Sequence, residues 1–153
     1  MIKKILVALD GSEPSQRALE YAVEFAEKWK SELTMLAVIP RVMLPIFPDE
    51  GFGATPLAAA RDFGQYQERM RGIYQNVLAE AEAKVRREHP DVKVVTRLEE
   101  GRPSATIVDA AESDGVDLIV IGSRGMGGIT GWILGGTSRN VVQSCTKPIL
   151  IVK

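Results

Sequence analysis

The sequence is 153 residues long, which is the size of a single domain with one hydrophobic core. Nineteen basic residues stand against twenty acidic ones, so the chain lacks the strong positive charge of a protein that binds DNA or RNA. The apolar share of 45% and the charged share of 25% indicate neither a disordered chain nor a membrane span. We therefore expect one domain over residues 1–153, with no nucleic acid and no membrane as partner.

Cysteine and histidine each occur only once, which excludes an internal disulfide and a zinc site. A single cysteine, Cys145, cannot form an internal disulfide, and with the single histidine, His89, it is too little for a zinc site. We expect Cys145 to serve in packing and His89 to face water at a helix end. The opening apolar run, residues 5–9, is too short for the core of a signal peptide, so we expect a cytoplasmic protein.

The first third of the chain predicts a strand, a helix and a second strand. Residues 5–9 are apolar and are followed at 10–12 by Asp-Gly-Ser, which predicts a buried strand, a turn and a helix cap. Apolar residues recur every three or four positions over 15–29, the pattern of an amphipathic helix. Residues 33–39 are almost entirely apolar and predict a second buried strand.

Residues 40–60 contain four prolines and two glycines, a density that excludes a regular helix or a central strand. We predict a long loop, which is apolar enough either to cover a ligand as a lid or to fold down on the body. A long helix is predicted after it, ending at His89 and Pro90. Its apolar stripe is expected to pack in the core and consists of Phe63, Tyr66, Met70, Ile73, Val77, Ala81 and Val85.

The remainder of the chain continues the alternation. The predicted segments are a strand at 92–98 at the edge of a sheet, a turn at 101–104, a short helix carrying Ile107, a buried strand at 118–121, a helix at 138–144 and an apolar strand at 148–152. Short apolar strands alternating with helices predict a doubly wound α/β fold, a five-stranded parallel sheet with helices on both faces. Ligands of such sheets bind beyond the carboxyl ends of the strands, where the strand order reverses.

The segment 122–138 follows a strand, runs into a helix and contains seven glycines. Glycine lets a phosphate approach the backbone, and the start of a helix adds N–H donors, so the segment predicts an anion site. It is not a Walker A loop, because Gly-Lys-Ser and Gly-Lys-Thr are absent, and Thr130 breaks the Rossmann glycine pattern. The alternative is that the glycines serve only tight turns and close packing.

These residues resemble the universal stress proteins, whose nucleotide signature places two residues between its first two glycines and nine before the third. Gly122, Gly125 and Gly135 have that spacing. The resemblance covers the whole chain, and its other matching segments are Leu9-Asp10-Gly11-Ser12, Gly101-Arg102-Pro103, residues 116–120 and residues 147–152. It implies a Rossmann-like sheet with strand order 3-2-1-4-5, related to the adenine nucleotide alpha hydrolases, and a homodimer.

The resemblance also implies a bound ATP or other adenine nucleotide, through whose phosphates Mg²⁺ or Mn²⁺ could reach the site. Asp10 would accept a hydrogen bond near the adenine, beside the backbone of Val38, and the alternative role for Asp10 is a helix cap beside Ser12. The other implied residues are Ala8, Leu9 and Ile121 against the base or ribose, and Gly122, Arg124, Gly125, Gly135, Gly136, Thr137 and Ser138 around the phosphates.

The sequence departs from the signature at Gly136, where the family has a Ser or Thr hydroxyl that touches phosphate. A hydrogen bond to a charged partner contributes about 1.5–3 kcal/mol, so its loss weakens or retunes binding. Thr137 and Ser138 are the candidates to replace that hydroxyl.

The predicted function is a nucleotide-responsive binding module of the stress response, with no catalytic residue, no metal site of its own and at most slow ATP turnover. Three alternatives stay open: a dimeric interaction protein that binds no nucleotide, a module for AMP or a cyclic nucleotide, and an ATP-consuming enzyme. A Ser-Gly-Gly phosphate loop is missing after the first strand, which counts against the enzyme. The strand from Ile149 to Val152 should lie at a sheet edge, and its unpaired backbone predicts a homodimer through that strand.

Overall fold

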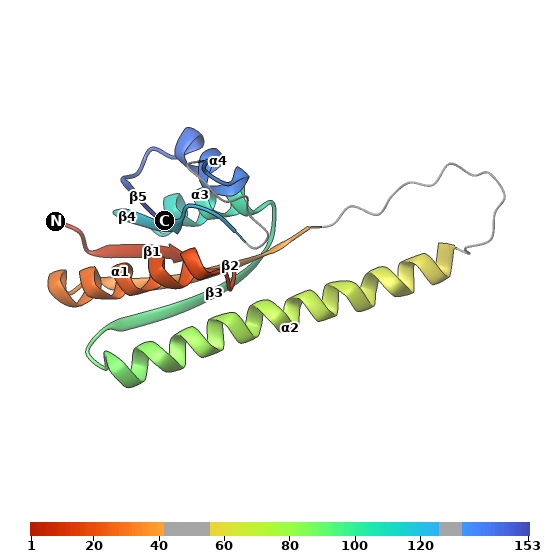
Figure 1. Cartoon of the computed structure of the whole chain (residues 1–153), viewed down its shortest axis with the longest axis horizontal. Helices are drawn as coiled ribbons and strands as arrows, with labels where there is room; N and C mark the ends of the chain where they lie inside the picture. Colours follow the sequence, from red (N-terminus) through yellow and green to blue (C-terminus); the bar gives the residue numbers. More distant parts are fainter. Residues whose placement is uncertain (42–55, 126–132) are drawn as a thin grey trace.

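The computed structural model of the chain describes residues 1–41, 56–125 and 133–153. In chain order its elements are β1 (Lys4–Ala8), α1 (Glu13–Trp29), β2 (Glu32–Pro40), α2 (Pro56–Glu88), β3 (Lys93–Gly101), α3 (Pro103–Ser113), β4 (Leu118–Gly122), α4 (Gly136–Ser144) and β5 (Ile149–Val152). The five strands form one parallel sheet in the order β3-β2-β1-β4-β5. The predicted doubly wound fold is confirmed, with α1 and α2 on one face and α3 and α4 on the other (Figure 1).

The two faces of the sheet carry two separate hydrophobic clusters. On β1, Ile5 and Val7 belong to the cluster under α1 and α2, whereas Leu6 between them belongs to the cluster under α3 and α4. All three side chains are fully buried. Because neighbouring side chains of a strand point to opposite faces, a sheet covered on both sides needs continuously apolar strands. This explains why the central strands lack the alternation of a half-exposed strand.

The turn between β1 and α1 is held by its own polar side chains. Ser12 is the N-cap of α1, and its hydroxyl accepts a hydrogen bond from the backbone N–H of Ser15 at 3.3 Å. Asp10 Oδ1 accepts one from the N–H of Ser12 at 2.9 Å, an Asx turn. Gly11 has a φ of 83°, a conformation that favours glycine. These contacts place the start of α1 directly beyond the carboxyl end of β1.

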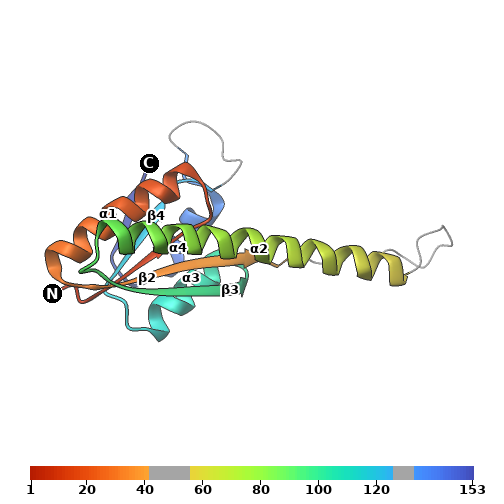
Figure 2. The same cartoon turned by 90° about the horizontal axis from the view of Figure 1, so that it is seen from below.

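The structure corrects two predictions about helix α2, where it begins and which residues it buries. It begins at Pro56, so the last five residues of the predicted loop are helical, while residues 42–55 lie outside the described part of the chain. In the predicted apolar stripe, Tyr66 and Ile73 are 44% and 43% exposed, and Tyr74 and Leu78 are buried in their place. The first turns of α2 extend past the sheet (Figure 2), and the sheet-facing side of the helix passes through Tyr74 rather than Ile73.

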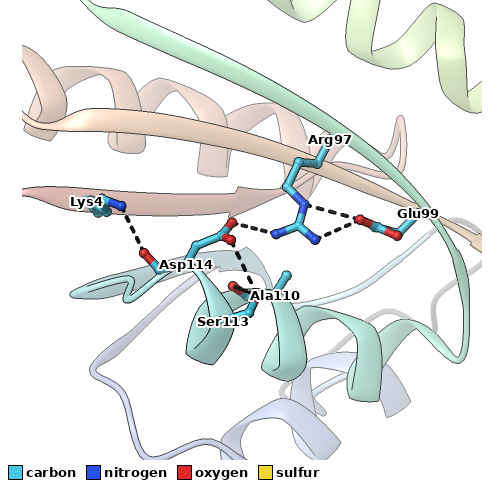
Figure 3. A network of polar contacts seen from close by, with 6 residues as sticks. All are labelled: Lys4, Arg97, Glu99, Ala110, Ser113 and Asp114. Atoms are coloured by element: carbon cyan, nitrogen blue, oxygen red, sulfur yellow. Dashed lines mark hydrogen bonds and ion pairs between the residues drawn. The ribbon is translucent and has the colours of Figure 1, made fainter.

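Strand β3 lies at one sheet edge, as predicted, and runs to Gly101, three residues beyond the predicted end. The Arg97 guanidinium joins it to α3 by contacting Glu99 at 2.8 Å and Asp114 at 2.6 Å (Figure 3). These hydrogen bonds, first that to Glu99 and then that to Asp114, raise the pKa of Arg97 above its ordinary value. Lys4 Nζ donates to the carbonyl oxygen of Asp114 at 3.1 Å, which ties β1 to the same corner.

Two single residues can now be placed. Cys145 is half-buried against the cluster under α3 and α4, as expected for a packing residue. His89 does not simply face water: its Nδ1 lies 2.7 Å from Glu27 Oε1, which joins the end of α2 to α1. No helix in the described ranges combines the length and the apolar character needed to cross a membrane.

Candidate functional site

A cavity of about 410 Å³ opens at the carboxyl end of the sheet, where β1 lies between β2 and β4. This is the position at which the strand order reverses, and ligands of doubly wound sheets bind there. The structure brings all twelve residues of the predicted site to its wall. The described lining residues are Ala8, Leu9, Asp10, Ser15, Leu36, Val38, Pro40, Tyr74, Pro103, Ile107, Ile121, Gly122, Arg124, Gly125, Gly135, Gly136, Thr137 and Ser138.

One side of the cavity is apolar because three strands end there. Ala8 ends β1, Val38 lies near the end of β2, and Ile121 lies near the end of β4. Ile107 of α3 closes this side from the helical layer and is 3% exposed. The carboxyl ends of parallel strands meet at one edge of a sheet, so this wall suits a flat, apolar part of a ligand.

The two carboxylate oxygens of Asp10 have different surroundings, one in the turn after β1 and the other toward the glycine-rich segment. Its Oδ1 is occupied by the N–H of Ser12, and the helix cap is supplied by Ser12 itself, so Asp10 holds the turn and does not cap α1. Its Oδ2 lies toward the glycine-rich segment, because a Cβ added at Gly125 would come within 2.9 Å of that atom. One carboxylate oxygen therefore points along the cavity wall toward Gly125.

The glycines of the cavity wall differ in what a side chain at each position would meet. A Cβ at Gly122 would lie 2.8 Å from the backbone carbon of Pro14, so close packing of β4 on the start of α1 explains this glycine. Gly125 leaves room for the Asp10 carboxylate. Nothing lies within 4 Å of a Cβ added at Gly136. Packing thus explains some of these positions, while Gly136 leaves open space at the cavity.

The N-terminus of α4 faces the cavity without a side-chain cap. Gly135 is its N-cap residue and makes no side-chain hydrogen bond to the first turn, in contrast to Ser12 at the start of α1. The N–H of Gly135 itself donates to the carbonyl oxygen of Ser123 at 2.8 Å, which fixes the start of the helix. The first N–H groups of a helix and its dipole attract negative charge. Gly136 and Thr137 of this first turn line the cavity.

Ser138 does not replace the hydroxyl that is missing at Gly136. Its Oγ lies 2.9 Å from the carbonyl oxygen of Ser123 and 3.1 Å from that of Gly135, and the residue is 2% exposed. A hydroxyl has one proton to donate, and here a carbonyl receives it. Of the two candidates, Thr137 is the exposed one. The sequence could not show this, because the partner Ser123 lies fifteen residues away.

The segment around Arg124 joins the two loops of the cavity. The backbone oxygen of Arg124 accepts a hydrogen bond from Ser12 Oγ at 3.4 Å, so the turn after β1 and the segment after β4 are linked. Arg124 is half-buried and lines the cavity. The rest of the glycine-rich segment, residues 126–132 with Thr130, lies outside the described residues.

Six wall residues were absent from the predicted site: Ser15, Leu36, Pro40, Tyr74, Pro103 and Ile107. Tyr74 is the most informative, because it comes from α2 and not from a strand end or the glycine-rich segment. The pKa of its phenol is raised, first by burial and then by the charge of Asp10 and by Tyr66. Its signal in the sequence was an aromatic residue one position away from the predicted stripe.

The described residues around the cavity form no cluster of metal ligands. Among the described residues no three His, Cys, Asp or Glu side chains gather in a group that could hold a metal ion. Asp10 is the one carboxylate among the described lining residues. What the wall offers is a set of backbone donors, a cation on Arg124 and an apolar surface.

Fold and site together define a small α/β protein with a ligand-sized cavity at the switch point of its sheet. The model of the universal stress protein family matches residues 1–153, and the chain belongs to that family. The universal stress protein YxiE of Bacillus subtilis is 32% identical over 153 residues, which is 100% of both chains. The predicted family membership is confirmed.

Solved structures agree with the fold. The hypothetical protein MJ0577, which Methanocaldococcus jannaschii encodes, has a structure that is 29% identical, with a TM-score of 0.69, over 100% of this chain and 96% of that one. The universal stress protein from Archaeoglobus fulgidus in complex with dAMP has a TM-score of 0.63 over 100% of both chains. At 23% identity this second likeness shows the fold alone.

Proposed function

We propose that the chain is a cytoplasmic regulatory module of the stress response that binds an adenine nucleotide, ATP above all, in the cavity at the switch point. The observation that carries the proposal is the arrangement of the cavity walls: the uncapped start of α4 lies at one wall and apolar strand ends form another. A nucleotide has the same two chemical parts, a polyanion and a flat ring. A protein of the same fold, the universal stress protein from Archaeoglobus fulgidus, forms a complex with dAMP, which is a nucleotide of the proposed class.

The chain is expected to hold ATP with little chemistry. Hydrolysis needs a base or a group that positions water, usually with a well-held metal ion. Asp10 is the one carboxylate among the described lining residues, and its Oδ1 already accepts a hydrogen bond from Ser12. A Mg²⁺ or Mn²⁺ ion would therefore arrive with the phosphates and be held mainly by them. Turnover is expected to be slow at most.

Titration calorimetry tests the proposal. The purified chain is titrated with ATP, AMP, cyclic AMP and inorganic tripolyphosphate, with and without Mg²⁺. We expect ATP to bind more tightly than AMP and cyclic AMP, because each added phosphate meets the start of α4 and Arg124. Tighter binding of AMP or of cyclic AMP would change the preferred nucleotide. Binding of none of the four would contradict the proposal.

A second candidate function is a dimeric interaction protein that binds no nucleotide. The loss of hydroxyl donors favours it: Gly136 has none, and the Ser138 hydroxyl is bonded to a carbonyl oxygen. Native mass spectrometry of the gently purified protein separates the two functions. A nucleotide mass retained on the protein supports the first, and an empty protein that also fails the titration supports the second.

The proposal includes a homodimer through β5. This strand lies at a sheet edge, and Ile149, Leu150 and Ile151 are only half-buried in the single chain. An apolar edge with unpaired backbone groups favours pairing with a second strand, and a twofold axis would align two copies of β5 antiparallel. Sedimentation at micromolar concentration should show a dimer, and Ile151→Lys should shift it to a monomer. A wild-type protein that sediments as a monomer would contradict the dimer.

A further inference from the structure

Tyr74 is held at the cavity by contacts on both sides of it along α2. One turn earlier, Arg71 Nη2 contacts Glu100 Oε2 at the end of β3, at 3.1 Å. One turn later, Val77 packs on the turn after β1, since a Cβ added at Gly11 would lie 3.1 Å from Val77 Cγ2. The helix is thus fastened to the sheet before and after Tyr74. These two contacts fix the stretch of α2 from which Tyr74 lines the cavity.

Tyr74 comes from one face of the sheet, whereas most of the apolar residues that line the cavity come from the other face. Leu36, Val38 and Ile121 belong to the cluster under α3 and α4, whereas Tyr74 belongs to the cluster under α1 and α2. It is the one residue of α2 among the described lining residues. Helix α2 packs on β2 and β3, as Figure 2 shows, whereas α4 begins after β4, on the other side of β1. Tyr74 therefore stands at the side of the cavity away from the start of α4.

The chemistry of Tyr74 complements that of Asp10. A phenol is a hydrogen-bond donor at neutral pH, and burial, then the charge of Asp10 and Tyr66, raises the pKa of Tyr74 further above neutrality. Asp10 Oδ2 is an acceptor on the same wall. A donor and an acceptor beside an apolar wall suit a ligand part that is flat and carries both kinds of group. The base of a nucleotide is flat and carries donors and acceptors, the sugar hydroxyls both donate and accept, and the ionised phosphates only accept.

We propose that Tyr74 contacts the nucleoside end of the bound nucleotide and donates a hydrogen bond to it beside the Asp10 carboxylate. This inference rests on the proposed function. It divides recognition between two parts of the wall: the start of α4 interacts with the phosphates, and Tyr74 interacts with the base or sugar. The number of phosphates should then have no influence on what Tyr74 contributes.

The test compares Tyr74→Phe with the wild type in the affinity for adenosine, AMP, ATP and inorganic tripolyphosphate. Removal of one hydroxyl should weaken the three adenine-containing ligands by a similar factor, about three- to tenfold. The affinity for tripolyphosphate should not change. Tyr66→Phe is the matched control, because Tyr66 lies on the same helix, is 44% exposed and does not line the cavity. It should bind all four ligands as the wild type does.

The outcomes separate this inference from the proposed function. If Tyr74→Phe binds the adenine-containing ligands as tightly as the wild type, the inference is wrong and the proposed function stands. If the variant loses affinity for tripolyphosphate by the same factor, Tyr74 acts through the structure of the site and the inference is also wrong. If the wild type binds none of the ligands, both fall. A melting temperature equal to that of the wild type confirms that the variant is folded.

Discussion

The two ends of the sheet each carry a cavity, and they differ in how far the polar groups around them are already paired. The cavity at the amino end is the larger, about 500 Å³ against about 410 Å³. Several of the charged residues that line it have partners: Lys93 pairs with Glu32, and Glu27 pairs with His89. Lys4, also on this wall, donates from Nζ to the backbone of Asp114.

At the carboxyl end the polar groups are arranged differently. Helix α4 starts without a side-chain cap, and the wall beside it has room at Gly136 for an added group. Donors that the fold has not used are what a ligand can bind, since a hydrogen bond to a ligand replaces one to water. Cavity volume alone therefore does not select the site that we propose. The unpaired start of a helix and the space beside it are the better guide.

The strongest test of this comparison is Gly125→Val. The first atom of the new side chain would come within 2.9 Å of Asp10 Oδ2, and Asp10 cannot withdraw without straining its hydrogen bond to Ser12. We expect the affinity for ATP to fall about tenfold to hundredfold or more, with the fold retained. Gly64→Val on α2 is the matched control, because nothing lies within 4 Å of its added Cβ. Titration calorimetry and circular dichroism provide the two measurements.

Equal affinity of Gly125→Val and the parent protein would mean that the carboxyl end does not hold the phosphates where proposed. Loss of affinity in the Gly64→Val control would show instead that the α2 surface contributes. The first result would remove the distinction between the two ends of the sheet.

Gly136→Ser tests the same end of the sheet by adding a donor for the ligand instead of blocking the site. The added side chain meets nothing within 4 Å and restores a hydroxyl at the start of α4, where the family signature has one. We expect ATP to bind about threefold to tenfold more tightly, because a hydroxyl adds one hydrogen bond to a charged group and loses one to water. AMP should gain less if the hydroxyl meets the outer phosphates. Unchanged affinity for both would indicate that Thr137 already supplies this donor.

Much of the fold could be predicted from the sequence because its rules are local. Apolar runs of strand length alternating with helical spacing determine a doubly wound sheet, and the family resemblance supplied the strand order. The family resemblance implied the site residues at the strand ends, and sheet geometry explains why they meet. Parallel strands end at one edge, so Ala8, Val38 and Ile121 meet there even though long segments separate them. The glycine-rich segment was visible from its composition.

The remaining features depend on contacts between distant segments. Tyr74 was missed because helical spacing over a long helix leaves the buried side uncertain by one residue, and only packing on the sheet decides it. The bond between Ser138 and Ser123, and the approach of Gly122 to Pro14, likewise join segments that no local pattern relates. For Asp10 the sequence left two roles open. The structure assigns one oxygen to the turn and directs the other toward Gly125.

The smallest expected effect is at the amino end, where Asp117→Asn should change stability and leave ATP affinity unchanged. The Asp117 carboxylate accepts hydrogen bonds from the backbone N–H groups of Lys3 at 2.8 Å and Lys4 at 3.0 Å. These bonds lower the pKa of Asp117 below its ordinary value of 3.8. A carboxyl whose pKa is lowered by folding stabilises the protein above its unfolded pKa, and this contribution is lost as the pH falls through the folded pKa. Water screens this partly exposed group, so Asp117→Asn should lower the free energy of unfolding by less than about 1 kcal/mol at pH 7.

Urea unfolding measured as a function of pH tests this prediction. The difference in the free energy of unfolding between the variant and the wild type should shrink below pH 3.8. A difference that persists there would contradict the electrostatic origin, and a loss of ATP affinity would show that the two ends of the sheet are coupled.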